Sequence, residues 1–310
     1  MFTHSVINGL QRVLKYDHRG FDKKIIAMCR LILVIVILPF TLSACLTRSG
    51  IEGVIVDGKG QPLVNVKLIA KAVEGTKEVE QLETITGSDG TFRFEHLSLS
   101  TAYLLIPRAE QWQTDSQFLA NSGSIWRNTR LEYPLVIRFT TKNGVITDTR
   151  TGLEWLPDSG NGFTWIGAGN SAKLFSSARG QCGWRLPTDN ELTEIYSFRA
   201  LGKQIRIDSL FRLRSPFVWT SSMIDYENSP DEYYKTMSAI SLESTALGGL
   251  FEVTTDRPNE YLDQVKAMTG KLAPLAKYFD FSNGSDRWQR EDEGGEDIRT
   301  LMVRIPCQAN

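Results

Sequence analysis

The sequence contains very little histidine, and this shortage restricts the chemistry that the chain can support. Its three histidines are His4, His18 and His96, so none follows Leu97. Ser-His-Asp catalysis, Cys-His catalysis and multi-histidine zinc sites each need at least one well-placed histidine. His96 lies near the end of a predicted strand, and we interpret it as structural. The composition therefore predicts a non-catalytic protein with no metal and no other cofactor.

The sequence also lacks an excess of basic charge. It has 35 lysines and arginines and 36 acidic residues. The first 44 residues contain six of the basic residues and two of the acidic ones. The remainder therefore has 29 basic and 34 acidic residues, a net charge of −5. Because nucleic-acid-binding proteins need a basic surface, we expect no nucleic-acid partner. The length is typical of about two domains.

An apolar run near the start, residues 31–40, is too short to cross a bilayer, which takes about 20 residues. Basic residues precede it: Lys23, Lys24 and Arg30. The small residues Ser43 and Ala44 follow it, directly before Cys45. This arrangement is typical of an export signal. The alternative is an uncleaved membrane anchor that starts at Ile25, but Arg30 would then lie inside the apolar segment.

The tetrapeptide Leu42-Ser43-Ala44-Cys45 resembles the bacterial lipobox. The resemblance implies that the Cys45 thiol is acylated and that residues 1–44 are removed as a signal peptide, or residues 28–44 if Met28 is the true start. Residues 45–52 would then be a lipidated tether to the membrane. Two or three acyl chains are enough for stable anchoring. Because no aspartate follows Cys45, we expect attachment to the outer membrane of a bacterial cell envelope, on its periplasmic or surface face.

Cysteine is scarce as well. Of the four cysteines, Cys29 lies in the signal and Cys45 is the predicted lipid acceptor. Cys182 and Cys307 remain, an even pair in an oxidising compartment, and we expect them to form a disulfide. The alternative is two free thiols in a copper or redox site, although no third soft ligand and no CxxC spacing supports it.

Residues 53–108 show short apolar alternations separated by Asp-Gly turns, a pattern that predicts half-buried strands. The segments Gly53-Val54-Ile55-Val56-Asp57, Gly60-Gln61-Pro62-Leu63 and Ser88-Asp89-Gly90-Thr91-Phe92-Arg93-Phe94 resemble the carboxypeptidase regulatory-like family. The resemblance implies a small antiparallel, transthyretin-like β-sandwich that acts as a spacer and carries no catalytic groups. Residues 109–133 are interpreted as a closing strand and linker.

Residues 134–310 are predicted to form the second domain. Asn143-Gly144 indicates a hairpin turn, and apolar residues at helical spacing follow Thr164-Trp165. Thr188 and Glu191 form a capping-box pattern at the start of a second helix. Residues 217–222 indicate a strand, and a closing strand is predicted from the alternation of Leu301, Val303 and Ile305.

These blocks resemble the Lcl C-terminal domain family, with Trp184-Arg185-Leu186-Pro187-Thr188 as the most specific match. The other matching blocks are Thr151-Gly152-Leu153 with Trp155, Thr164-Trp165, Trp219-Thr220-Ser221-Ser222 and Val303-Arg304. The resemblance implies a C-type-lectin-like α+β fold, in which two helices pack on a twisted antiparallel sheet and the chain ends lie together. A Cys182–Cys307 disulfide would suit that closure. Residues 240–299 fit the family poorly, and we interpret them as an insertion.

The predicted site residues fall into two groups. Structural roles are expected for the family-block residues Trp155, Trp165, Trp184, Arg185, Pro187 and Trp219. Ligand binding is expected from aromatic residues in the variable part, because exposed aromatics flanked by polar residues are typical of binding surfaces; these are Tyr226, Tyr233, Tyr234, Tyr261 and Trp288. The Glu-Pro-Asn and Trp-Asn-Asp motifs of calcium-dependent lectins do not occur, so calcium-bridged sugar binding is not predicted.

Taken together, the sequence predicts a lipid-anchored envelope protein whose lectin-like domain recognises a glycan or a protein without catalysis. One alternative is a scaffold that assembles other envelope components. Another is an oxidase-like enzyme related to the formylglycine-generating enzymes, which share the C-type-lectin-like fold. Such an enzyme would have to use Cys182 and Cys307 as its reactive pair.

Overall fold

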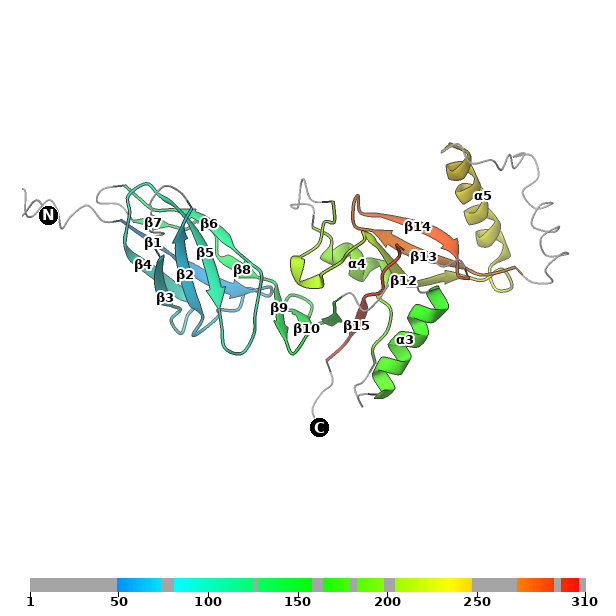
Figure 1. Cartoon of the computed structure of the whole chain (residues 1–310), viewed down its shortest axis with the longest axis horizontal. Coiled ribbons are helices and arrows are strands. Elements are labelled where there is room, and N and C mark those ends of the chain that lie inside the picture. Colours follow the sequence, from blue (N-terminus) through cyan, green and yellow to red (C-terminus); the bar gives the residue numbers. More distant parts are fainter. Residues whose placement is uncertain are drawn as a thin grey trace, which may run out of the picture.

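A computed structural model of the chain describes residues 49–73, 81–124, 128–157, 164–178, 183–197, 204–246, 272–292 and 297–306. The predicted signal peptide and the residues Cys45, Cys182, Cys307 and Tyr261 lie outside these ranges. The fold is α+β and is built mostly from antiparallel sheets. Figure 1 shows two units at opposite ends of the molecule, joined between β8 and β9. Within the described ranges, no helix is long and apolar enough to span a membrane.

In the part of the chain that the structure describes, the first unit contains eight strands in two sheets. The strands are β1 (Ser49–Asp57), β2 (Lys67–Ala72), β3 (Gln81–Ile85), β4 (Thr91–Leu97), β5 (Ala102–Arg108), β6 (Phe118–Asn121), β7 (Thr129–Arg130) and β8 (Leu135–Ile137). One sheet has the order β3-β2-β5-β6, and the other joins β4 to β1, which also pairs with β7 and β8. One hydrophobic cluster takes residues from both sheets, so the two layers share a core.

Period-two alternation explains most of this core. Leu68 and Ala70 of β2 and Phe92 and Phe94 of β4 are buried, while the residues between them face outward. In β1 the core-facing residues are Ile51 and Ile55. The Asp-Gly turns form as expected, since Asp57 Oδ1 accepts hydrogen bonds from the N–H groups of Lys59 and Gln61. Alternation with turn residues therefore predicts these strands correctly.

Two pairings in this unit were not expected from the sequence. Strands β7 and β8 both pair with β1 in the parallel direction, so the unit is not wholly antiparallel. Strand β8 also extends the core of this unit to Ile137, although residues from 134 onward were assigned to the second domain. Both strands are only two or three residues long, and local periodicity cannot indicate such a distant parallel partner.

Among the described residues, the second unit contains seven strands and three α-helices. The elements are β9 (Phe139–Lys142), β10 (Val145–Asp148), β11 (Glu154–Leu156), α3 (Trp165–Ala178), α4 (Asp189–Ile195), the 3-10 turn η1 (Ser209–Phe211), β12 (Phe217–Ile224), α5 (Pro230–Ala246), β13 (Leu275–Asp280), β14 (Ser285–Arg290) and β15 (Met302–Arg304). The sheets have the orders β15-β11-β10-β9 and β12-β13-β14. The main core of the unit lies between these sheets and α4.

The sheet β12-β13-β14 carries helices on both faces. Ala168 of α3 packs in a cluster with Trp219 and Ala276. On the opposite face, the registered pair Val218 and Phe279 packs with Leu192 of α4. Further along the same face, α5 packs on Leu275 and Ile224 through Tyr233.

The local signals for α3, α4 and the β9–β10 hairpin are confirmed. Asn143 and Gly144 have φ values of 53° and 78°, as a type I′ turn requires. Thr188 caps α4 with the reciprocal Glu191 contact. Strands β13 and β14 lie within the range interpreted as an insertion, and they supply two of the three strands of their sheet.

The predicted alternation of the closing strand is wrong at its end. Leu301 and Val303 are buried, but so is Met302, and Ile305 is 74% exposed. Strand β15 pairs with β11 on one side and bridges Arg185 through Val303 on the other. All three residues of β15 are buried, so the strand is covered on both faces as well as paired on both edges. A strand buried on both faces does not show alternation.

The two units contact each other beyond the covalent connection. The Gly58 N–H of the β1–β2 turn donates to Thr149 Oγ1 at 2.7 Å. Gln113 and Thr141 exchange two backbone hydrogen bonds. Ser209 Oγ donates to Asp115 Oδ2 at 2.9 Å. These contacts come from separate segments of both units.

Candidate ligand-binding surfaces

The structure brings together four of the five aromatic residues predicted to bind a ligand. Tyr233 and Tyr234 come from α5, Tyr226 from the segment before it, and Trp288 from β14. Tyr226 lies edge-on to both other tyrosines, with ring centroids 5.6 Å and 5.4 Å apart. Tyr261 lies outside the described residues. The variable-region aromatics therefore form one cluster where α5 meets the sheet.

Packing accounts for most of this aromatic cluster. Tyr233 is 2% exposed, and its hydroxyl donates to the Ala273 carbonyl at 2.8 Å. Burial raises the pKa of its phenol above the ordinary value. The hydroxyls of Tyr226 and Tyr234 lie 3.1 Å apart, within hydrogen-bond distance. The tyrosines thus fix α5 on the sheet, and Trp288 is the member whose ring lies against the Lys277 ammonium.

A group of polar residues lies on the same sheet face, between the α4 and α5 contacts. We call it the polar stripe: Asp189 of α4, Ser222 of β12, Lys277 of β13, and Asp286 and Trp288 of β14. Asp189 Oδ2 accepts hydrogen bonds from Ser222 Oγ at 2.9 Å and from Lys277 Nζ at 3.0 Å. Lys277 Nζ also lies 3.6 Å from Asp286 Oδ2 and 4.9 Å from the centre of the Trp288 ring.

Two features of the polar stripe are chemically unusual. Asp189 Oδ1 is buried and receives no hydrogen bond from any described residue. A buried carboxylate oxygen without a donor costs free energy. Burial also raises the pKa of Asp286, although the neighbouring Lys277 ammonium opposes the rise. The stripe therefore has an acceptor that a bound donor group could satisfy.

The tryptophans of the family-block group are occupied by packing. Trp155 and Trp219 are fully buried, in the clusters beside α4 and α3 respectively. Trp165 Nε1 donates to the Thr220 carbonyl at 2.7 Å. The Trp184 ring packs on Phe175 and lies 4.4 Å below the Arg304 guanidinium. None of these four rings is arranged to stack on a ligand.

Arg185 and Pro187 hold the segment before α4 in place. Arg185 forms a two-point ion pair with Glu191, with N–O distances of 2.8 Å and 2.6 Å. Its hydrogen bond to Glu191 raises the pKa of the guanidinium. The Pro187 carbonyl accepts a 2.7 Å hydrogen bond from the Ser221 N–H. Both residues connect α4 to the rest of the unit.

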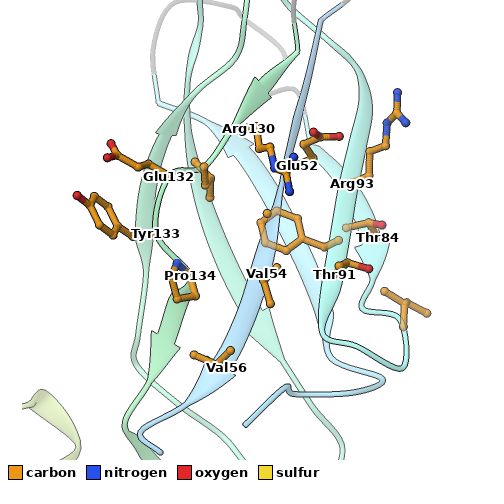
Figure 2. A pocket seen from close by; sticks show the side chains of 14 residues that line it. Glu52, Val54, Val56, Thr84, Thr91, Arg93, Arg130, Glu132, Tyr133 and Pro134 are labelled. Carbon is orange, nitrogen blue, oxygen red and sulfur yellow. The ribbon is translucent and has the colours of Figure 1, made fainter. Parts of the chain in front are cut away.

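A hollow of about 880 Å³ lies on the first unit, on the outer face of the sheet that contains β1 and β4. Figure 2 shows Val54 and Val56 along its floor, with Glu132 and Tyr133 on one side and Thr91 and Arg93 on the other. Sequence reasoning missed this surface because it treated the unit as a spacer. The available signal was Tyr133-Pro134, an aromatic in a polar connecting segment.

The remaining candidate chemistry of the sequence falls elsewhere. Within the described ranges, no three or more His, Cys, Asp or Glu side chains are grouped so that they could hold a metal ion. His96 is exposed at the end of β4, with a φ of 67°. The cysteine pair considered for a disulfide or a redox site is not among the residues that the structure describes.

Comparison with known proteins does not add a family. A scan against protein-family models finds no match for the chain, and a search of curated proteins finds none either. The two family resemblances noted in the sequence therefore stay predictions.

Proposed function

We propose that this chain is a lipid-anchored protein of the bacterial envelope whose second unit recognises a glycan without catalysis. The observation that carries the proposal is the unpartnered, buried Oδ1 of Asp189 within the polar stripe. The oxygen is covered in the structure, so a ligand hydroxyl would donate the missing hydrogen bond after a neighbouring side chain of the stripe moves aside. The free energy that this oxygen loses on burial would then be recovered when the ligand binds.

The rest of the polar stripe is suited to a polyhydroxylated ligand. Asp189 and Asp286 supply acceptors and the Lys277 ammonium supplies donors, all within a few ångströms of one another. The Ser222 O–H is donated to Asp189, so its oxygen serves as a further acceptor. Trp288 adds an aromatic side chain beside these groups. Specific ligand sites commonly combine an apolar surface with a few convergent polar groups. A glycan presents both hydroxyls and a C–H face, so it matches this combination.

The anchor is proposed from the lipobox-like tetrapeptide that ends at Cys45. Strand β1 begins at Ser49, only four residues later. An acylated Cys45 would therefore hold the first unit close to the membrane surface. Mass spectrometry of the mature chain is expected to find an acylated N-terminal cysteine, and an intact Met1 would contradict the anchor.

The finer fold assignment is part of the same proposal. A C-type-lectin-like second unit is supported by the three-stranded sheet with helices on both faces. It is also supported by the structural placement of the Trp184–Thr188 block between α4 and β15. A carboxypeptidase regulatory-like first unit is supported by its two four-stranded sheets around one core.

The test is binding of the full chain to an array of neutral and sulfated glycans at low and high salt. The chain is purified in a detergent without a sugar headgroup, so that the detergent cannot compete. We expect salt-resistant binding to a defined glycan and loss of that binding in Asp189→Asn. The matched control is Asp292→Asn, an exposed carboxylate just beyond β14 that pairs only locally with Arg290.

Two results would contradict the proposal. Binding that disappears at high salt would indicate nonspecific charge contacts, which salt screens. Equal glycan binding by Asp189→Asn and the control would show that the polar stripe is not the site. Thermal unfolding of each variant identifies any loss of binding that comes from unfolding.

A further inference from the structure

We propose that the hollow on the first unit is a second binding site and that it takes a neutral oligosaccharide. The hollow lies on the outer face of β1 and β4, away from the polar stripe, so this inference does not depend on the proposed function. It assigns a binding role to a unit that the sequence predicts to be only a spacer.

The hollow exists because β1 has two short parallel partners with a gap between them. Strand β7 pairs with β1 at Ile51 and Glu52, and β8 resumes the pairing at Ile55. Between them the chain follows β1 only through one hydrogen bond, from the Leu131 N–H to the Glu52 carbonyl at 2.9 Å. The edge of β1 at Gly53 and Val54 is consequently left without a paired strand.

The floor of the hollow is apolar, and one rim is aromatic. Val54 and Val56 form the floor, and Pro134 lies beside them (Figure 2). Tyr133 is 72% exposed at one side, and Ile85 is another exposed apolar residue of the lining. An exposed aromatic next to an apolar floor can cover the C–H face of a sugar while its hydroxyl stays in water.

The charged side chains of the hollow balance one another. Glu52 is in register with Arg93 of β4 on one side and with Arg130 of β7 on the other. Glu132 adds a second carboxylate, so the lining has two acidic and two basic side chains. A charged ligand would meet like charge as well as opposite charge. A neutral ligand with many hydroxyls can use the guanidinium donors and the carboxylate acceptors together.

The size of the hollow favours an oligosaccharide over a protein partner. Its volume of about 880 Å³ lies in the upper part of the usual range for small-molecule sites, roughly 300–1,000 Å³. Fourteen residues line it, whereas a standard protein–protein interface uses roughly 20–30 residues on each side.

The experiment measures binding of four neutral hexasaccharides to the full chain in a detergent without a sugar headgroup. The probes are maltohexaose, cellohexaose, mannohexaose and chitohexaose, with hexagalacturonate as the charged comparator. We expect one neutral probe to bind with an affinity that changes little with salt. Tyr133→Ala is expected to weaken that binding about tenfold or more, and Tyr133→Phe to retain it because the ring is kept.

Two control variants separate this site from other effects. Leu119→Ala removes an exposed side chain from β6, on the other sheet, and should leave the affinity unchanged. Asp189→Asn, in the polar stripe, should also leave the affinity for the neutral probe unchanged. The proposals for the hollow and for the polar stripe are therefore tested independently. The proposal is overturned if no neutral probe binds, if only hexagalacturonate binds, or if Tyr133→Ala binds as tightly as the wild type.

Discussion

Asp148 shows how much of the second unit depends on a single buried carboxylate. Its side chain is 1% exposed, and its two oxygens accept hydrogen bonds from Arg138 Nε at 3.1 Å and Nη2 at 2.8 Å. Oδ1 also accepts from the Arg150 N–H. Arg138 Nη1 in turn donates to the Glu194 carbonyl at the end of α4. The pair therefore links β10, the chain before β9 and α4.

Removal of this carboxylate should strongly destabilise the protein. We expect Asp148→Ala to lower the free energy of unfolding by about 3–5 kcal/mol, because it leaves the Arg138 guanidinium without its buried partner. The control is Glu95→Ala, whose ion pair with Arg93 is more than half exposed on both sides. That variant should change stability by less than about 1 kcal/mol. Urea unfolding of both variants makes the comparison, and equal effects would contradict it.

Individual site residues were harder to predict than individual structural residues. The roles of Trp219, Trp184 and Arg185 follow from apolar or paired neighbours close in the sequence. The polar stripe combines residues from α4, β12, β13 and β14, up to 99 positions apart between Asp189 and Trp288. Of its members, only Trp288 stood out in the sequence, because a lone Asp, Ser or Lys has no local pattern that indicates its distant partners.

At the scale of elements, α4 depends on a charged capping arrangement. Glu191 accepts hydrogen bonds from the Thr188 N–H at 2.8 Å and from Arg185. Burial acts to raise the pKa of Glu191, but the hydrogen bonds from Arg185 and Thr188 outweigh it and hold this pKa below its ordinary value. A carboxylate whose pKa is lowered by folding adds stability above its unfolded pKa, and this stability is lost as the pH falls through the folded pKa.

This linkage predicts a pH-dependent effect of Arg185. We expect Arg185→Ala to be less stable than the wild type near pH 6, and the difference to shrink as the pH falls below the ordinary glutamate pKa of about 4.3. Urea unfolding at several pH values measures the difference. Arg93→Ala is the control, because its exposed partner Glu95 shows no such capping role. If the stability difference between Arg185→Ala and the wild type stayed constant from pH 6 down to about pH 3, this result would contradict the mechanism.

Most elements of the fold could be predicted wherever the signal is local. Alternation between Asp-Gly turns indicated β2 and β4, and the capping box indicated α4. Pairings between distant segments could not be predicted. Strands β7 and β8 are too short to have a period, and β13 and β14 looked unlike the rest of the unit although they complete its sheet. Whether such a segment forms a strand depends on its pairing with a distant partner, and a short window of sequence does not contain that partner.

At the scale of the whole molecule, the contact between the units determines whether the first unit is a flexible spacer or part of a rigid body. The β1–β2 turn lies directly against Thr149 and Arg150. A Cβ atom on Gly58 would be 2.6 Å from the Arg150 nitrogen, a backbone atom that cannot move aside cheaply. Gly58 is thus required by the close approach of the two units.

Gly58→Val should therefore loosen the junction while each unit stays folded. The expected result is faster hydrogen exchange of the amides in residues 148–152 and of Gln113, whose N–H donates across the junction to Thr141. Exchange in β13 and β14, which lie in a different part of the second unit, should be unchanged. The matched control is Gly60→Asn in the same turn, where no atom lies within 4 Å of the new Cβ and asparagine tolerates the φ of 80°.

The hydrogen-exchange comparison shows whether the second unit is held at a fixed orientation when it meets a ligand. If only Gly58→Val speeds exchange at the junction, the native contact is rigid, and the second unit is held at a fixed orientation to the first. An anchored first unit would then set the distance of the polar stripe from the membrane. If Gly58→Val exchanges like the control, the junction is already open in solution. The second unit would in that case change its orientation relative to the first. The hollow and the polar stripe would then be able to bind separate glycan chains.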